Sequence, residues 1–278
     1  MIPSFQSISQ PDLDLLLCLD PFNRRVRVDE FQGDLQQGLL QILDLSPDWA
    51  EKIIIKAHRE QIGYLNDQGW SQEAMIPGYF NGEDLYFLVF YPQKPRAHSD
   101  RLDLDESIAN TILGMDRKPI ETEKRDVIQQ SSLQDAEKLA ILYETVFDIY
   151  PAPLGDPSYI RKTMEHGTVY VHIERDGQVL SAASAEVNRK FANAELTDCA
   201  TLPEEQGKGY MPALLTRLEE LLIQQKITCL YTICRAPSFG MNKVFHNLGY
   251  NFSGCLVNNC NIYSGIENMN VWHKLINR

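Results

Sequence analysis

The chain has 278 residues and a formal net charge of −12 at pH 7; 23% of its residues are charged and 44% are hydrophobic. This composition is ordinary for a folded protein and excludes extensive disorder. The acidic balance argues against a nucleic-acid partner, because binding to a phosphate backbone needs clustered Lys and Arg. The length allows one large domain or two small ones, and we expect two.

The N-terminal sequence MIPSFQSISQPDLDLLLCLD has no basic segment followed by a long apolar one. No stretch of the chain approaches the roughly 20 apolar residues of a membrane helix, so we expect a cytoplasmic protein without a membrane partner. Six cysteines are too few for a disulfide scaffold in a chain of this length. The pairs Cys229/Cys234 and Cys255/Cys260 lie in strand-like sequences, which predicts buried thiols; a zinc site is the weaker alternative, and we expect no metal.

Residues 1–92 are predicted to form a first α/β domain. RVRVDEF (25–31) predicts a strand, DLQQGLLQILDL (34–45) a helix, KIIIKAHREQIGYLNDQGW (52–70) a strand and a helix, and EDLYFLVFY (83–91) a strand. This order repeats part of the second half, so we predict a reduced copy of the same fold that lacks its glycine turn. Ordinary α/β similarity without duplication is the alternative.

Residues 93–125 are predicted as a connector, because charge and Pro gather at both ends of a short amphipathic run. The second domain, residues 126–278, begins with a strand (126–130) and a helix that starts near Ser132 or Gln134 and stops at Pro151. A hairpin follows at 168–187, joined by Asp176-Gly177, and then the strand NAELTDCATL (193–202).

The rest of the chain predicts a helix after a glycine turn, a buried strand (227–236), a short helix ended by Gly249, and a final strand pair (251–265 and 267–276). The second half is therefore predicted as a mixed α/β sheet with antiparallel hairpins at its ends.

TLPEEQGKGYMPALLTRLEELL (201–222) predicts the end of a strand, a turn with two glycines and an amphipathic helix. A helix N-terminus leaves backbone N–H groups unpaired and carries a partial positive charge. Gly207 and Gly209 would let a phosphate approach those groups closely, so a pyrophosphate is the natural ligand. Neither a Gly-Lys-Ser/Thr ending nor a full G-x-G-x-x-G is present.

The run from Gln206 to Met211 resembles the acyl-coenzyme A pyrophosphate loop of the GNAT N-acetyltransferases, Gln/Arg-x-x-Gly-x-Gly/Ala. Gln206 and Gly209 match, whereas Met211 departs from the small residue of the pattern. Gly249-Tyr250 matches the Gly-aromatic pair that ends a GNAT helix. The resemblance covers roughly residues 126–278 and implies a GNAT-like fold that binds acetyl-CoA. It implies as ligands Ala200, Thr201, Leu202, Gln206, Gly207, Lys208, Gly209, Tyr210, Met211 and, for the pantetheine arm, Asn242.

A narrower resemblance covers the whole chain. NAELTDCATLPEEQGKG, YTICRAPSFGMNKVFHNLGY, LVNNCNIYSGIENMNVWHKL, VFDIYPAP and GYFNGEDLYF are similar to segments of the β-lysine N-acetyltransferases. That family acetylates the ε-amine of β-lysine to make a zwitterionic compatible solute for osmoadaptation. The alternatives are another small amine, such as lysine, a diamine or a polyamine, or a degenerate acyl-CoA sensor, which Met211 and Phe245 would suit.

An amine attacks a thioester only when neutral, and a lysine-type amine has a pKa of about 10.4, so a general base is needed. Glu195 lies eleven residues before Gln206, the spacing of the general-base glutamate in histone-acetylating GNATs. Asp198 is the competing base, or a ligand for the substrate's ammonium. On a regular strand positions 195 and 198 face opposite sides, so both can serve only if the strand has a bulge. A solvated or ion-paired carboxylate is the alternative for either.

Many GNATs protonate the leaving thiolate with a tyrosine four residues before the Gly-aromatic pair, but here that position is Phe245. Either no general acid acts, or Tyr231 or a water replaces it; His246 is a weaker candidate. The superfamily also implies that a backbone N–H at the splayed end of LTDCATL polarises the carbonyl oxygen.

For β-lysine, Arg235 is our candidate ligand of the carboxylate, with Asn258, Asn259 and Glu267 near it; a surface salt bridge is an equally good interpretation of Arg235. Tyr150 is expected in the loop that shapes the acceptor site. The first domain is expected to pack against the second and to roof the acceptor pocket. The partner is thus a small-molecule amine, and the oligomeric state stays open.

Overall fold

The computed structural model describes residues 3–118, 127–263 and 265–276. We call residues 3–92 the first half and residues 127–276 the second half. The first half contains β1 (Ser4–Gln10), β2 (Leu13–Asp20), β3 (Arg25–Gly33), α1 (Leu35–Leu45), β4 (Lys52–Ala57), α2 (Ile62–Asp67), β5 (Ser71–Phe80) and β6 (Glu83–Phe90). Between the halves lie a short 3-10 helix (Lys94–Ala97) and α3 (Leu102–Leu113).

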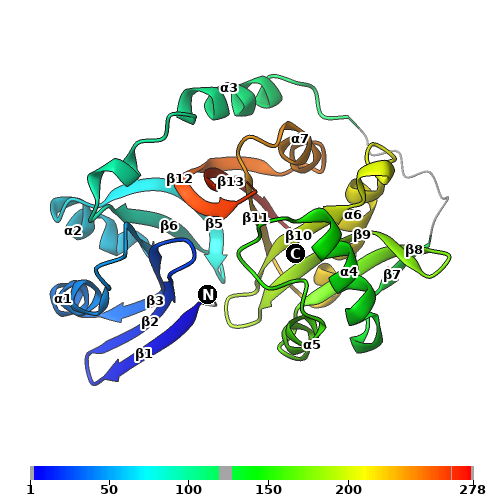
Figure 1. Cartoon of the computed structure of the whole chain (residues 1–278). Coiled ribbons are helices and arrows are strands. Elements are labelled where there is room, and N and C mark those ends of the chain that lie inside the picture. Colours follow the sequence, from blue (N-terminus) through cyan, green and yellow to red (C-terminus); the bar gives the residue numbers. More distant parts are fainter. Residues whose placement is uncertain (1–2, 119–126, 264, 277–278) are drawn as a thin grey trace.

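The second half contains β7 (Ile128–Gln130), α4 (Ala136–Val146), α5 (Pro157–Glu165), β8 (Val169–Arg175), β9 (Gln178–Asn188), β10 (Asn193–Thr201), α6 (Tyr210–Gln224), β11 (Cys229–Arg235), α7 (Phe239–Asn247), β12 (Asn251–Ile262) and β13 (Gly265–Leu275). The thirteen strands of the described residues form one sheet, in the order β1-β2-β3-β4-β6-β5-β12-β13-β11-β10-β9-β8-β7. The predicted mixed α/β class is confirmed, and Figure 1 shows β5, β12 and β13 between the two halves.

Four elements have no counterpart among the sequence predictions: β1, β2, α5 and β5. Pro77 and Gly78 lie inside β5, and both residue types argue against a strand when read locally. Helix α5 is short and mostly polar, so its periodicity carries little signal. The last part of the predicted connector, 119–125, lies outside the described residues.

From β8 onward, after β7, α4 and α5, the second half follows the same order of elements as the first. In the first half β1-β2-β3-α1-β4-α2-β5-β6 gives the sheet order 1-2-3-4-6-5, and in the second half β8-β9-β10-α6-β11-α7-β12-β13 gives 8-9-10-11-13-12. Each half has one parallel pair, β3 with β4 and β10 with β11, which flank the crossover helix. The proposal of a reduced copy rests on this correspondence.

The halves meet where β5 and β12 pair at Gly254 and Ala74. Gly254 has a φ of 129°, and a Cβ there would lie 2.4 Å from the carbonyl oxygen of Glu73. Only glycine permits this approach, so the continuity of the sheet depends on it.

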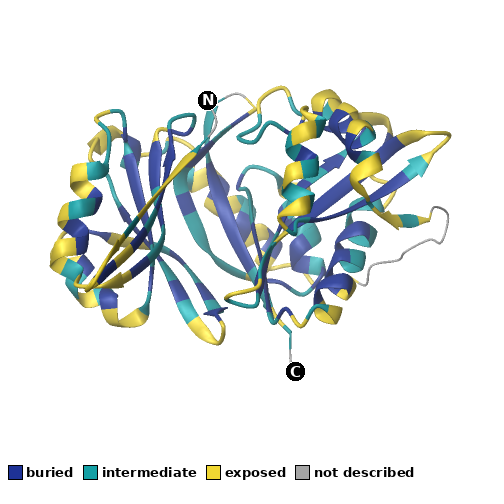
Figure 2. Ribbon diagram, turned by 90° about the horizontal axis from the view of Figure 1, so that it is seen from below, coloured by how far each residue is buried: buried dark blue, intermediate teal, exposed yellow. Residues whose placement is uncertain are grey.

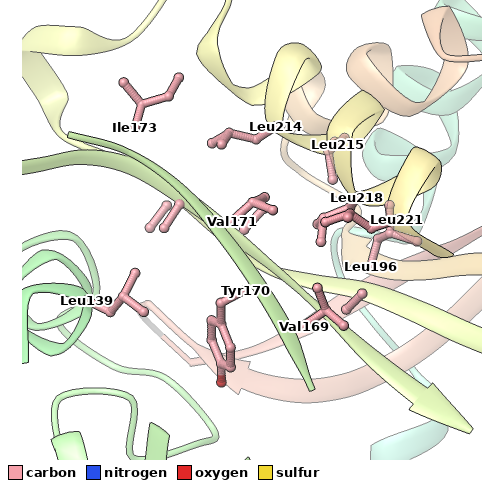
Figure 3. Close-up of a cluster of buried hydrophobic side chains, with 14 of the residues drawn as sticks. Leu139, Val169, Tyr170, Val171, Ile173, Leu196, Leu214, Leu215, Leu218 and Leu221 are labelled. Carbon is pink, nitrogen blue, oxygen red and sulfur yellow. The ribbon is translucent and has the colours of Figure 1, made fainter. Parts of the chain in front are cut away.

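Each half has its own apolar core, and a third group of buried residues belongs to both. The core of the second half includes α6 leucines that face β8 and β10, as Figure 3 shows for Leu214, Leu215 and Leu218. The third group, here called the shared apolar cluster, includes Ile54, Tyr79, Phe87, Tyr231, Leu256 and Val271. Burying such side chains stabilises by about 1.5–3 kcal/mol each, so this cluster holds the halves together.

The surface follows from the same pattern. Figure 2 shows buried residues along most strands, with exposed residues on the outward sides of the helices and at hairpin tips, and β1 at the edge of the sheet is mostly exposed. No helix among the described residues is long and apolar enough to cross a membrane.

The cysteines are free thiols, and burial raises the pKa of Cys229, Cys234 and Cys255 to about 12. The described residues contain no group of three or more His, Cys, Asp or Glu that could hold a metal.

Candidate active site

A cavity opens where β10 and β11 separate. These parallel strands pair at Asn193, Ala194 and Glu195, and among the described residues their pairing ends where Glu195 lies beside Tyr231. Beyond that point a cavity of about 640 Å³ lies between them, lined by the loop after α4, by β10 and β11, by the turn before α6 and by α7. The sheet is therefore split at the place where the resemblance expects the acyl-CoA.

A bulge in β10 brings both candidate carboxylates to one side of the sheet. The pairing of β10 with β9 shifts between Thr197 and Ala200, and Asp198 has a φ of 50°. Glu195 pairs with Glu186, which lies two residues from Ser184 on the same face of β9. Ser184 donates a hydrogen bond to Asp198, so Asp198 lies on the face of Glu195. The bulge that Glu195 and Asp198 need in order to share one face of β10 is therefore present.

Asp198 lines the cavity and is only 7% exposed. Its Oδ1 accepts a hydrogen bond of 2.9 Å from the Tyr150 hydroxyl, and its Oδ2 accepts one of 2.6 Å from Ser184. Burial raises the pKa of Asp198 to about 6, and Glu186 acts in the same direction, against the two hydrogen bonds. Tyr150 stacks on Phe147, with ring centroids 4.3 Å apart. Tyr150 and Asp198 are thus brought together at the cavity wall.

Glu195 precedes the lining residues of β10 and is half-buried. Burial raises the pKa of its carboxyl to about 7, and Glu186 adds to this effect. Lys56, Arg27 and a hydrogen bond from Tyr231 act to lower it. A carboxyl with this pKa is present in both protonation states near neutral pH, which suits a general base.

The helix that opens into the cavity lacks a side-chain cap. The first turns of α1, α5 and α7 are capped by Asp34, Asp156 and Ser238, which accept hydrogen bonds from backbone N–H groups. The N-cap of α6 is Gly209, with a φ of 80° and no side-chain hydrogen bond. Gly207 has a φ of 78°, and a Cβ there would meet no atom within 4 Å. The turn and the N–H groups of α6 therefore fit an anionic ligand such as a pyrophosphate.

Several residues expected to bind acetyl-CoA line this cavity, and others do not. The lining includes Thr201, Gln206, Gly207, Gly209, Tyr210 and Met211. Ala200 and Leu202 are buried in the core of the second half. The Lys208 ammonium lies 2.8 Å from a carboxylate oxygen of Glu205.

Asn242 differs from its expected role as a contact of the pantetheine arm. Its side chain is fully buried, and its amide nitrogen donates to the carbonyl oxygens of Arg235 (2.9 Å) and Ser238 (2.8 Å). Its Oδ1 accepts hydrogen bonds of 2.9 Å from Asn270 and Trp272. Asn242 therefore holds the loop after β11 behind the cavity wall and shapes the cavity without lining it.

Arg235 lines the cavity but is already paired. Its Nε and Nη2 bind the two Glu267 oxygens at 2.8 and 2.7 Å, and its guanidinium lies 4.0 Å from the centre of the Tyr263 ring. This arrangement fits the interpretation of Arg235 as a salt-bridge partner better than its interpretation as a ligand of the substrate's carboxylate.

Asn258 and Asn259 do not gather around Arg235. The Asn258 amide donates to the carbonyl oxygens of Arg96 and His98, at 2.9 and 2.8 Å. The carbonyl oxygen of Asn259 accepts a bond of 2.9 Å from Arg25 of β3. Both residues fasten β12 to the first half and to the connector, and neither is among the residues that line the cavity.

The structure also places the three residues considered in connection with a general acid: Phe245, Tyr231 and His246. Phe245 lines the cavity, is fully buried and packs edge-on against Tyr250. The Tyr231 hydroxyl bonds to Glu195, and burial raises its pKa well above the usual value, so it stays protonated. His246 is buried, with Nε2 3.0 Å from the carbonyl oxygen of Met115.

Sequence reasoning missed a group from the first half that adjoins Glu195. Lys56 lies 2.8 Å from an oxygen of Asp29, which also binds Arg27. The Lys56 ammonium is 5.8 Å from the centre of the Tyr79 ring, which in turn lies 5.4 Å from the Tyr231 ring. Charged residues inside the apolar strands RVRVDEF and KIIIKA were the available signal, because a half-buried charge needs a partner.

Comparisons with known proteins agree with this geometry. The model of the "Acetyltransferase (GNAT) family" matches residues 139–250. The protein named N-acetyltransferase YodP of Bacillus subtilis (strain 168) is 35% identical, over 97% of this chain and 98% of its own length. Two proteins named Beta-lysine N(6)-acetyltransferase are also similar. That of Methanosarcina mazei is 35% identical over 81% of this chain and 91% of its own, and that of Methanococcus maripaludis 33% over 94% and 96%.

Proposed function

Because the chain belongs to the GNAT acetyltransferase family, we propose that it transfers the acetyl group of acetyl-CoA to the ε-amine of β-lysine. Acetyl transfer is the activity of the family, and the acceptor is the part proposed. Two relatives named for β-lysine support that acceptor. In the structure, the proposal rests on the bulge that presents Glu195 and Asp198 on one side of β10, beside a cavity that ends at the uncapped α6.

The residues around the turn suit acetyl-CoA, which supplies an acetyl group activated as a thioester. Gly207, Gly209 and the first N–H groups of α6 would hold its pyrophosphate, because positive φ angles and an open helix N-terminus expose backbone donors. The separation of β10 from β11 leaves room for the chain that carries the thioester.

We assign the role of general base to Glu195. A proton moves from the acceptor's ammonium to its carboxylate, which leaves the amine neutral and nucleophilic. Raising the carboxyl pKa from 4.5 to about 7 makes that transfer cheaper by about 3 kcal/mol, since one pKa unit corresponds to about 1.36 kcal/mol. This matters because the amine pKa is about 10.4.

Asp198 has a different proposed role. Both of its oxygens already accept hydrogen bonds, from Tyr150 and Ser184, so it is less available as a base. Its negative charge beside the cavity would attract the acceptor's ammonium, and its bonds hold the bulge in place. Phe245 offers no proton to the leaving thiolate, and a thiol pKa of about 8.5 lets the thiolate leave unprotonated at modest cost.

The test is thiol release from acetyl-CoA with β-lysine, α-lysine and spermidine at equal concentration, with the acetylated position found by NMR. We expect β-lysine to have the highest kcat/KM and to be acetylated on its ε-nitrogen. Glu195→Gln should lose rate in kcat by about 100-fold or more, the usual contribution of a general base. Glu195→Gln with unchanged kcat would reject Glu195 as the base. A higher kcat/KM for another amine would replace the acceptor, and acetyl-CoA binding without turnover of any amine would favour the sensor.

A further inference from the structure

Charged side chains from both halves meet next to Glu195. Arg27 and Asp29 of β3 and Lys56 of β4 come from the first half, and Glu186 and Glu195 from the second; we call these five residues the junction cluster. Arg27 donates to both oxygens of Asp29, at 2.9 and 3.0 Å, and Lys56 lies 2.8 Å from one of them. The Lys56 ammonium lies over the Tyr79 ring, and that ring packs against Tyr231, the hydrogen-bond partner of Glu195, so the two groups of charges are neighbours.

The first-half part of this cluster has one more cation than carboxylate. Two cations share one carboxylate, Asp29, in the first half, whereas Arg235 is matched one to one by Glu267. The fork between Arg27 and Asp29 uses Nε and Nη2 and leaves Nη1 outside it. Burial acts to lower the pKa of Lys56, but Asp29 and Tyr79 raise it, so Lys56 stays a cation at neutral pH. The first half therefore presents a net positive charge toward Glu195.

The junction cluster is accessible, and its member Glu195 directly precedes the β10 residues that line the cavity. The side chains of Arg27, Lys56 and Asp29 are 31%, 15% and 13% exposed. Glu186 is exposed, pairs with Glu195 across the strands and acts on Asp198 at the cavity wall. The charges thus run from carboxylates beside the cavity to cations in the first half, an order that matches an acceptor with an amine at one end and a carboxylate at the other.

We infer that Arg27 and Lys56 bind the carboxylate of the acceptor, so that the first half selects amino acids over amines without a carboxylate. The inference rests on the proposed function, because it names a second contact for the same acceptor. Guanidinium and ammonium groups held by a shared carboxylate are good ligands for a second carboxylate. Glu186 lies where it can face a second ammonium, such as the β-amino group of β-lysine.

The first test compares two acceptors that differ in the carboxylate, 6-aminohexanoate and hexylamine, in the wild-type enzyme. We expect a clear preference in kcat/KM for 6-aminohexanoate. Lys56→Met and Arg27→Met should each raise the KM of β-lysine and of 6-aminohexanoate by about 10- to 100-fold, the effect of losing one hydrogen bond to a charged group. The KM of hexylamine should change less than about threefold. Kinetics are read at a pH where Glu195 is ionised in every variant.

The matched control is Lys190→Met. Lys190 also joins the halves, through an ion pair of 2.6 Å with Glu30, but it is outside the junction cluster and its side chain is 55% exposed. Lys190→Met should leave the KM of both acceptors unchanged. Lys56→Arg should keep most of the preference for 6-aminohexanoate over hexylamine.

Three results would overturn the inference: equal loss with both acceptors, an unchanged KM for the amino acids, or a wild-type enzyme that does not distinguish 6-aminohexanoate from hexylamine. The last result needs no variant, so a variant that fails to fold leaves the test intact. A failure of the proposed function is seen separately, with β-lysine itself: the wild-type enzyme would then turn over α-lysine or spermidine with a higher kcat/KM, or would turn over no amine.

Discussion

At the scale of single residues, the site depends on carboxyl groups held out of water. Glu195 and Asp198 both have raised pKa values because burial disfavours their charged forms, and Glu186 adds to both effects. Such groups cost folding free energy, and carboxyl groups with raised pKa values are typical of functional sites. Their two environments differ, since Glu195 faces cations and Asp198 faces hydroxyl groups.

The pH dependence of kcat with saturating amine should report Glu195. Its carboxylate is the active form, so kcat should fall as the pH drops through about 7 and level off above it. Glu186, Tyr231, Lys56 and Arg27 are the charged or titratable groups that act on it. Since Lys56 lowers the pKa of Glu195, Lys56→Met should move this fall in kcat to higher pH. If kcat of Glu195→Gln still falls below about pH 7, the titrating group is another residue.

Asp198→Asn should stabilise the protein while weakening catalysis. The folded-state pKa of Asp198, about 6, exceeds its ordinary value of 3.8, so its contribution to stability is fully present below pH 3.8 and is lost as the pH rises through 6. Removing the charge should recover up to about 3 kcal/mol at pH 8 and almost nothing near pH 4. Thermal unfolding at both pH values measures this. A stabilisation of the same size at pH 4 would contradict the electrostatic origin.

At the scale of elements, α1 and α6, the helices that follow β3 and β10, differ at their N-termini. Helix α1 begins with Asp34, whose side chain accepts a bond of 2.6 Å from the Gln37 N–H, whereas α6 begins with Gly209 and no side-chain cap. Local sequence decides both outcomes, because Asp is a preferred N-cap and glycine provides a positive φ without a side chain.

Gly207→Ala should weaken acetyl-CoA binding specifically. Its φ of 78° costs a non-glycine residue about 1–2 kcal/mol, and the added methyl group would enter the space in front of α6. We expect the KM of acetyl-CoA to rise about tenfold or more, with little change in the KM of the amine. Gly69→Ala is the matched control, because Gly69 has a φ of 83° and open space around its Cβ, but lies far from the turn in sequence and in the first half. If both variants raised the KM of acetyl-CoA equally, the cause would be general backbone strain and not the loss of space in front of α6.

At the scale of the whole molecule, we propose that residues 1–92 form a reduced copy of the second half, joined by the connector 93–125 to the domain 126–278. The shared order of elements supports this, and Asp34 occupies the helix N-terminus that corresponds to α6. Close beside it, a Cβ at Gly33 would lie 2.0 Å from the Asp12 carbonyl oxygen, so that turn has no room for a ligand. In this view the first half lost a cofactor site and kept a place in the acceptor site.

The proposal of a reduced copy predicts one CoA per chain. Isothermal titration of the full-length protein should give a stoichiometry of one, abolished or strongly weakened by Gly207→Ala. Two sites per chain, or one site unaffected by that variant, would show that the first half binds the cofactor.

The junction of the halves also contains a buried ion pair. Lys52 of β4 is fully buried, and its ammonium lies 2.7 Å from Glu73 of β5 and 2.7 Å from the Val257 carbonyl oxygen of β12. The Tyr91 hydroxyl donates to the same Glu73 carboxylate. Burial lowers the pKa of Lys52 to about 8, against the opposing effect of Glu73.

Glu73→Gln would leave that ammonium without its counter-charge, which should cost about 3–5 kcal/mol of unfolding free energy. Denaturant unfolding measures it, and the double variant with Lys52→Met should lose less than the sum of the two single variants. A cost below about 1 kcal/mol for Glu73→Gln would show that the pair contributes little to the stability of the protein.

The sequence by itself determined the mixed α/β class, the hairpin at Asp176-Gly177 and the glycine turn before α6. It also named Glu195, Asp198 and Tyr150 as candidate site residues. Each depends on short-range information: alternation, helix caps, the conformational freedom of glycine, or a run of residues that resembles a family. It did not find β5, where Pro77 and Gly78 mask the strand, and it could not tell a ligand from a structural contact at Asn242, Asn258 and Arg235.

Only the tertiary structure decided those roles, because the partners of these side chains lie far away in the chain. The Asn258 amide reaches Arg96 and His98, and the cations that act on Glu195 come from Arg27 and Lys56. Periodicity shows which side of a strand a residue occupies but not what the fold places opposite it. The bulge at Asp198 adds a second example, since one extra residue reverses the face of a side chain that alternation alone would assign.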